Sequence, residues 1–209
     1  MLLPSAYFPP IGWMALAVRY SEIILEKHET FPKQTLRNRC QIQSANGLLN
    51  LSIPVIRTFG NHTKTGEITL IEDNIWQKQH IRAIFSAYKK SPFFDFYEEY
   101  FVSFFNQKFH RLIDVNESSI KLIIKLLKVN IELVYNEEWK LAAGVDDFRH
   151  YFNKPQRTTI GQDNYIQVFS DRFPFMGNLS VIDLLFNLGP ASLPYLKSVS
   201  FPIIQDKQF

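Results

Sequence analysis

The start of the chain constrains the fold most, because two short apolar segments flank a helix signal there. Residues 1–7 (MLLPSAY) and 21–26 (SEIILE) have the length of buried strands. Pro10 is well placed to open the intervening helix, since its ring fixes φ where no backbone donor is needed. This order predicts a β-α-β unit within an α/β fold that has a mixed sheet. Ligands of such sheets bind beyond the carboxyl ends of the strands, so the loops 5–10 and 26–34 are candidate binding segments.

A β-hairpin is expected next, because Asn46-Gly47 separates two segments of alternating character, RCQIQSA and LLNLSIPV. A type I′ turn needs positive φ at both central positions, which this dipeptide tolerates. Pairing Ala45 with Leu48 then creates one apolar and one polar face, with Cys40 and Ile42 on the former and Arg39 and Gln41 on the latter. Arg37 has the parity of Arg39, so we expect both guanidinium groups on the polar face.

The rest of the chain predicts a helix-rich second half. Capping residues, prolines and apolar periodicity indicate helices over 73–88, 92–106, 116–128 and 180–188 and strands over 131–135 and 165–170. In the last helix, Ser180 and Asp183 have the spacing of a capping box. We find no repeat and no linker composition, so we expect one domain over 1–209.

Composition excludes several classes of protein. The 23 Lys and Arg against 20 Asp and Glu give a net charge of only +3, so nucleic acid is not an expected partner. One cysteine permits no internal disulfide, and no apolar run approaches the roughly 20 residues that span a bilayer, so a cytoplasmic protein without a transmembrane segment is expected. The glycines form no nucleotide-binding fingerprint, and the five histidines show no metal-ligand spacing. We therefore expect no cofactor and no metal.

The segment Lys33 to Arg39 is the first candidate ligand site. Lys33, Arg37 and Arg39 could form an anion cradle around Asn38, since guanidinium groups match phosphate oxygens bidentately. The alternative is a solvated basic strand edge, which discourages edge pairing.

Two further groups of residues carry polar chemistry. His80 suits a general base or phosphate ligand, with Trp76 as a stacking wall, but a packed core-edge pair is the alternative. His28 and Glu26 follow the second strand and could transfer protons, unless they belong to an ordinary surface loop. Ser5 and Tyr7 follow the first strand and could face the same ligand site at the strand ends, or serve only the turn beside Pro9.

Four strings in order along the chain carry a family resemblance: PSAYFPPIGW, FPKQTLRNRCQIQSANGLLNLSIPV, WQKQHIRAIFSAYKKSPFFDFYEEY and LSVIDLLFNLGP. Together they resemble the WbqC-like protein family in the form seen in Bacteroidetes. The resemblance implies a bacterial cytoplasmic protein of gene clusters for O-antigen and other surface polysaccharides, acting on activated sugars.

Two functions are compatible with these observations. The first is a transferase-like enzyme that binds a nucleotide-activated sugar as its small-molecule substrate. Its catalytic candidates are His80, His28 and Glu26, and its ligand-binding candidates are Lys33, Arg37, Asn38, Arg39, Tyr7, Ser5 and Trp76. The alternative is a non-catalytic assembly or scaffolding protein that uses the aromatic helix 92–106 as its interface, either with a copy of itself or with a pathway protein.

Overall fold

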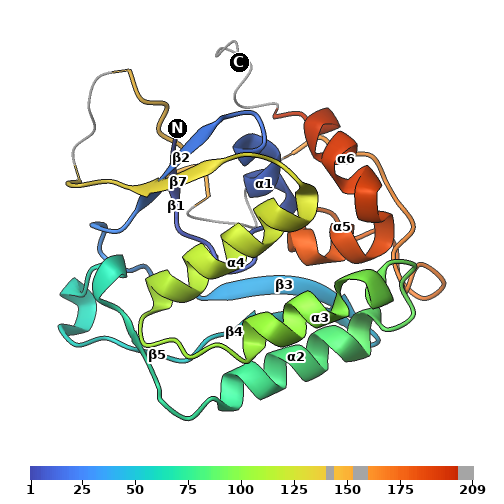
Figure 1. The fold of residues 1–209 in the computed structure, drawn as a ribbon, viewed down its shortest axis with the longest axis horizontal. Helices are drawn as coiled ribbons and strands as arrows, with labels where there is room; N and C mark the ends of the chain where they lie inside the picture. Colours follow the sequence, from blue (N-terminus) through green and yellow to red (C-terminus); the bar gives the residue numbers. More distant parts are fainter. Residues whose placement is uncertain (140–143, 153–159, 202–209) are drawn as a thin grey trace.

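A three-stranded parallel sheet forms at the start of the chain in the computed structural model, which describes residues 1–139, 144–152 and 160–201. Its order is β1 (Leu2–Pro4), β2 (Glu22–Glu26) and β7 (Glu132–Tyr135), with β2 in the centre (Figure 1). The helix α1 (Ile11–Ala17) connects β1 to β2, which confirms the expected β-α-β unit and the α/β class.

A further stretch of chain lies along the outer edge of β1. The backbone N–H of Leu2 donates to the carbonyl of Asp146 at 2.8 Å, and the N–H of Phe148 donates to the carbonyl of Leu2 at 3.0 Å. The bridge between Leu2 and Asp147 is parallel. Residue 149 therefore follows a parallel segment in the way that residues 5, 27 and 136 follow β1, β2 and β7.

Apolar burial fixes α1 against its surroundings. Every residue of α1 is buried, and the helix packs against α5 (Val181–Leu188) and α6 (Ser192–Ser198). The indole N–H of Trp13 donates to the carbonyl of Pro4 at 3.0 Å, which satisfies a polar group inside the core. The helix thereby holds the loop after β1 in place.

The hairpin consists of β3 (Arg39–Ser44) and β4 (Gly47–Ser52), but its expected turn is wrong. Ser44 pairs with Gly47 and Cys40 with Leu51, so the turn residues are Ala45 and Asn46. The Ser44 hydroxyl accepts from the Asn46 N–H at 3.3 Å and donates to the Gly47 carbonyl at 2.9 Å. Gly47, the first residue of β4, directly follows this turn and has φ of +94°, which favours glycine.

The register error is two residues, so the side chains keep their expected faces. Cys40 and Ile42 are buried, whereas Arg39 and Gln41 are half-exposed. Gln43 departs from this pattern, because it lies on the polar side and is nonetheless buried.

Three helices of the middle of the chain pack into the same hydrophobic core as β1 and α1. They are α2 (Ile75–Tyr88), α3 (Phe94–Phe105) and α4 (Leu112–Leu127). Helix α2 packs against β3 and α3, and α3 packs against α4. Two short elements of sheet, β5 (Val55–Ile56) and β6 (Thr69–Leu70), and the 3₁₀ turns η1 (Gly60–His62) and η2 (Thr65–Glu67) connect the hairpin to α2.

Helix α4 begins at Leu112, about one turn earlier than expected, so that Asn116 lies inside the helix and contacts other groups there. The Asn116 side chain donates to Ser5 Oγ at 3.2 Å, and Ser119 Oγ accepts from the Phe8 N–H at 3.2 Å. Both residues are buried in the helix interior, where they hold the loop after β1. Phe8 has φ of +39°, so this loop contains a strained backbone position.

The C-terminal region corrects two further expectations. The described residues 165–170 contain no strand. Ser180 caps α5 by accepting from the Ile182 N–H at 3.4 Å, but Asp183 takes no part in a capping box. Its buried carboxylate accepts instead from Tyr88 Oη, Tyr165 Oη and Gln167 Nε2. The 3₁₀ turn η4 (Gly189–Ala191) then separates α5 from α6, because Gly189 and Pro190 end the helix.

Over the described residues, no helix is long and apolar enough to cross a membrane.

Candidate functional site at the strand ends

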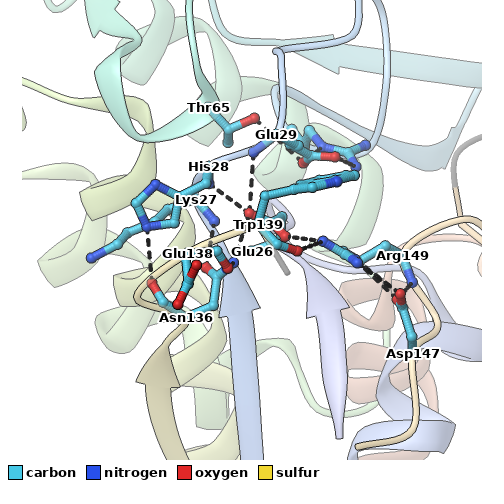
Figure 2. A network of polar contacts seen from close by, with 11 residues as sticks. Glu26, Lys27, His28, Glu29, Thr65, Asn136, Glu138, Trp139, Asp147 and Arg149 are labelled. Atoms are coloured by element: carbon cyan, nitrogen blue, oxygen red, sulfur yellow. Dashed lines mark hydrogen bonds and ion pairs between the residues drawn. The ribbon is translucent and has the colours of Figure 1, made fainter. Parts of the chain in front are cut away.

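Glu26, the last residue of β2, is fully buried. Its carboxylate contacts residues that follow several of the parallel segments (Figure 2). Its Oε1 accepts from the backbone N–H groups of His28 at 2.6 Å and Glu29 at 3.1 Å. The same oxygen accepts from Asn136 Nδ2 at 2.9 Å. A buried carboxylate that receives several donors is a fixed group, so Glu26 orders the loop after β2 and the residue after β7.

His28 lies half-exposed above this carboxylate. Its Nε2 is 3.1 Å from the backbone carbonyl oxygen of Asn136. A carbonyl only accepts, so Nε2 carries the hydrogen, and in the neutral ring Nδ1 is the nitrogen with the lone pair. The structure therefore brings His28 and Glu26 together, as expected, and fixes one tautomer of the imidazole.

Arg149 enters the site from the segment beside β1. Its Nη1 is 2.5 Å from Glu26 Oε2, and its Nη2 is 2.8 Å from Asp147 Oδ2. Burial alone would lower the pKa of Arg149, but hydrogen bonds to Asp147 and Glu26 outweigh burial and raise it. This guanidinium is a permanent cation held between two carboxylates.

Trp139 completes this side of the site. The Arg149 guanidinium carbon lies 3.9 Å from the centroid of the indole ring, and Arg149 Nη1 donates to the Trp139 carbonyl at 3.1 Å. Stacking on an aromatic face is a characteristic of arginine.

A second ion pair, Glu29 with Arg37, adjoins the first and corrects the expected place of Arg37. Arg37 is fully buried, and its Nε and Nη2 donate to the two carboxylate oxygens of Glu29, the latter over 2.6 Å. Thr35 Oγ1 accepts from Arg37 Nη1 at 3.3 Å, and Thr65 Oγ1 donates to Glu29 Oε1 at 3.4 Å. The guanidinium faces inward, so the shared polar face expected for Arg37 and Arg39 is wrong.

The other members of the expected anion cradle lie apart from Arg37. Arg39 is half-exposed on β3, and its Nε donates to Ser52 Oγ at 2.9 Å. Lys33 is exposed in the loop after β2, and the Asn38 side chain donates to the Ile53 carbonyl at 3.1 Å. The reason is local, because residues 35–38 form a turn and strand parity starts only at Arg39.

Tyr7, Trp76 and His80 form a separate buried cluster. Tyr7 Oη lies 2.8 Å from His80 Nδ1, and the Trp76 ring centroid is 5.4 Å from that of His80. Burial lowers the pKa of His80 to about 4 against the opposing effect of the Ser52 backbone. Burial is the main cause that raises the pKa of Tyr7. Among the described contacts, none joins this cluster to Glu26 or His28.

Ser5 follows β1 and is fully buried. Its hydroxyl accepts from Asn116, so the structure assigns it a contact with α4 rather than an open position at the strand ends. The described residues contain no group of three or more His, Cys, Asp or Glu side chains that could hold a metal ion.

The aromatic helix is largely a core element. Phe94, Phe101, Phe104 and Phe105 of α3 are buried. Phe96 and Tyr100 are its exposed aromatic residues, at 72% and 40%.

Sequence reasoning missed Arg149, Asn136, Trp139 and Glu29 as members of the site. Asn136 follows a predicted strand, which is a usable signal. Arg149 and Trp139 lie in a stretch without periodicity, and only the tertiary fold brings them to Glu26.

The chain was compared with curated proteins, solved structures and protein families. It is 23% identical over 223 residues to the uncharacterized protein Rv1507c of Mycobacterium tuberculosis (strain ATCC 25618 / H37Rv), covering 94% of this chain and 96% of that protein. No solved structure matches. The WbqC-like protein family matches residues 5–169, which is most of the chain, so the chain belongs to that family.

Proposed function

We propose that the protein is a transferase-like enzyme of bacterial surface polysaccharide biosynthesis. It binds a nucleotide-activated sugar at the strand ends beside His28. Membership of the WbqC-like family supports the pathway through the resemblance described above, and the strand ends support the location, since open α/β sheets bind ligands there.

The observation that carries the proposal is the hydrogen bond from His28 Nε2 to the Asn136 carbonyl, 3.1 Å long, beside the buried Glu26. It leaves Nδ1 of a half-exposed imidazole as the proton acceptor. Glu26 acts as a positioning residue, because its carboxylate oxygens already accept hydrogen bonds. The donors are groups of His28, Glu29, Asn136 and Arg149.

In the proposed reaction, an acceptor hydroxyl attacks the activated carbon of the sugar. A carbon–oxygen bond forms to the acceptor, and the bond from the sugar to the phosphate breaks. The hydroxyl proton passes to His28 Nδ1, and the nucleotide leaves with the electron pair of the broken bond. The exposed Lys33 and the half-buried Lys27 are the cations of this loop that can attract the phosphates.

The test is a thermal-shift screen with a panel of nucleotide sugars, followed by measurement of nucleotide release. Saturation at 100 times the Kd adds about 2.7 kcal/mol to the free energy of unfolding. We expect one sugar nucleotide to raise the melting temperature, and His28→Ala to abolish nucleotide release without changing the fold. His110→Ala is the matched control, because His110 is 78% exposed and pairs only loosely with Glu72 at 3.6 Å.

Two results would overturn the proposal. One is a wild-type protein whose melting temperature no nucleotide sugar changes at millimolar concentration. The other is a His28→Ala variant that releases nucleotide at the wild-type rate.

A further inference from the structure

Trp139 differs from the other two tryptophans in its exposure. Trp13 and Trp76 are in the core, at 0% and 3%, whereas Trp139 is 44% exposed. A large aromatic side chain that is partly exposed and also held in one orientation offers a rigid apolar surface on which a ligand can stack.

One face of the Trp139 ring is held by a rigid group. The Arg149 guanidinium lies 3.9 Å from the ring centroid and is fixed by Glu26 and Asp147. Arg149 also anchors the Trp139 backbone through the carbonyl. The side chain is therefore preorganised, which reduces the entropy that a ligand must overcome when it stacks there.

The charges around Arg149 restrict what the ring can bind. Arg149 carries one positive charge between two carboxylates, so it does not recruit a phosphate group. Its cation also draws π electron density toward the covered face of the indole. The exposed remainder of the ring is then a poor partner for a ligand cation and a better one for a flat, neutral, polarisable ring.

We propose that Trp139 is the stacking platform for the nucleobase of the activated sugar, an inference that rests on the proposed function. Glu26 connects the two parts of the site, since its Oε2 holds Arg149 beneath Trp139 while its Oε1 holds the backbone of His28. In this proposal the base stacks on Trp139 and the reacting sugar lies toward His28, and Figure 2 labels both side chains around Glu26.

The experiment measures binding by calorimetry with three probes. They are the nucleotide sugar identified in the thermal screen, the matching nucleoside monophosphate and the matching sugar 1-phosphate. The variants are Trp139→Leu, which keeps apolar volume without a ring, and Trp139→Phe, which keeps a ring. Phe96→Leu on α3 is the control for loss of an exposed aromatic ring.

We expect Trp139→Leu to weaken the binding of the nucleotide sugar and of the monophosphate by about 10- to 100-fold, which is the loss that removal of base stacking produces. Trp139→Phe and Phe96→Leu stay within about threefold of the wild type, and the sugar 1-phosphate, which lacks a base, is unaffected by all three variants.

The outcomes separate this inference from the function. The stacking platform alone is overturned if the wild type binds the nucleotide sugar and Trp139→Leu binds the monophosphate with the same affinity as the wild type. Equal weakening of the sugar 1-phosphate assigns Trp139 to the sugar and overturns the nucleobase assignment. A wild type that binds none of the three probes overturns both proposals.

Discussion

Glu26 and Arg149 are separated by 123 residues in the sequence, yet Nη1 of the arginine lies 2.5 Å from Oε2 of the glutamate inside the protein. The two side chains are 0% and 7% exposed. This ion pair connects the end of the central strand β2 to the segment that runs beside β1, and with it holds the loop that carries His28.

Arg149→Ala is expected to destabilise the protein strongly, because it leaves the buried Glu26 carboxylate without its cation. Removing one partner of a buried pair costs about 3 to 5 kcal/mol of unfolding free energy. Urea denaturation measures it. The control is Arg111→Ala, whose exposed pair with Asp114 is worth about 1 kcal/mol or less. Equal losses in the two variants would contradict the structural role of Arg149.

Replacement by alanine should destabilise the protein far more at Arg37 than at Arg39. Arg37→Ala leaves the Glu29 carboxylate buried and unpaired and should cost about 3 to 5 kcal/mol. Arg39→Ala removes a hydrogen bond from an exposed position and should cost about 0.5 kcal/mol. Chemical denaturation of both variants distinguishes them, and a stable Arg37→Ala protein that loses only ligand binding would restore the phosphate cradle.

Arg37 and Arg39 also show how much of the hairpin could be predicted from the sequence. Parity predicts the faces of Cys40 and Ile42 correctly even though the register is displaced, because a shift of two residues preserves sidedness. The same parity fails at Arg37, because Asn38 N–H donates to the Thr35 carbonyl and the chain turns before β3 begins. Parity is a property of strands and does not extend into turns.

The polar cluster around Glu26 could be predicted from the sequence in its position, but only some of its members could. Glu26 and His28 follow an apolar run that reads as a strand, so the sequence indicates them directly. Arg149 and Asn136 reach Glu26 from more than 100 residues away. No local pattern encodes that distance, since the contact depends on the order of strands in the sheet.

His80 should make stability depend on pH. Burial lowers its pKa from 6.5 to about 4, so between these values the unfolded chain binds more protons than the folded one. The stabilisation is therefore present above about pH 6.5 and is lost as the pH falls toward 4, by about 3 kcal/mol. Unfolding free energies of the wild type and His80→Gln across this range measure the difference. A constant difference between the two proteins would contradict the lowered pKa.

Gly189→Ala should destabilise the junction between α5 and α6. Gly189 has φ of +51°, and an added Cβ would lie 2.4 Å from Cδ1 of Phe93. Strain and overpacking together should cost about 2 to 5 kcal/mol. Gly60→Ala separates the two effects, because Gly60 has φ of +58° with nothing within 4 Å and should cost only about 1 to 2 kcal/mol. If thermal denaturation shows a larger loss of stability for Gly60→Ala than for Gly189→Ala, the contact with Phe93 does not determine the cost at Gly189.

The most direct test of the strand-end site follows the imidazole signals of the five histidines by NMR during titration with the nucleotide sugar. The ring signal of His28 should shift with saturation, and its Nδ1 should show the larger change, because Nε2 is held by the Asn136 carbonyl. The signals of the buried His80 and the exposed His110 should stay in place. A titration that shifts His80 or His110 while His28 remains unchanged would contradict the site.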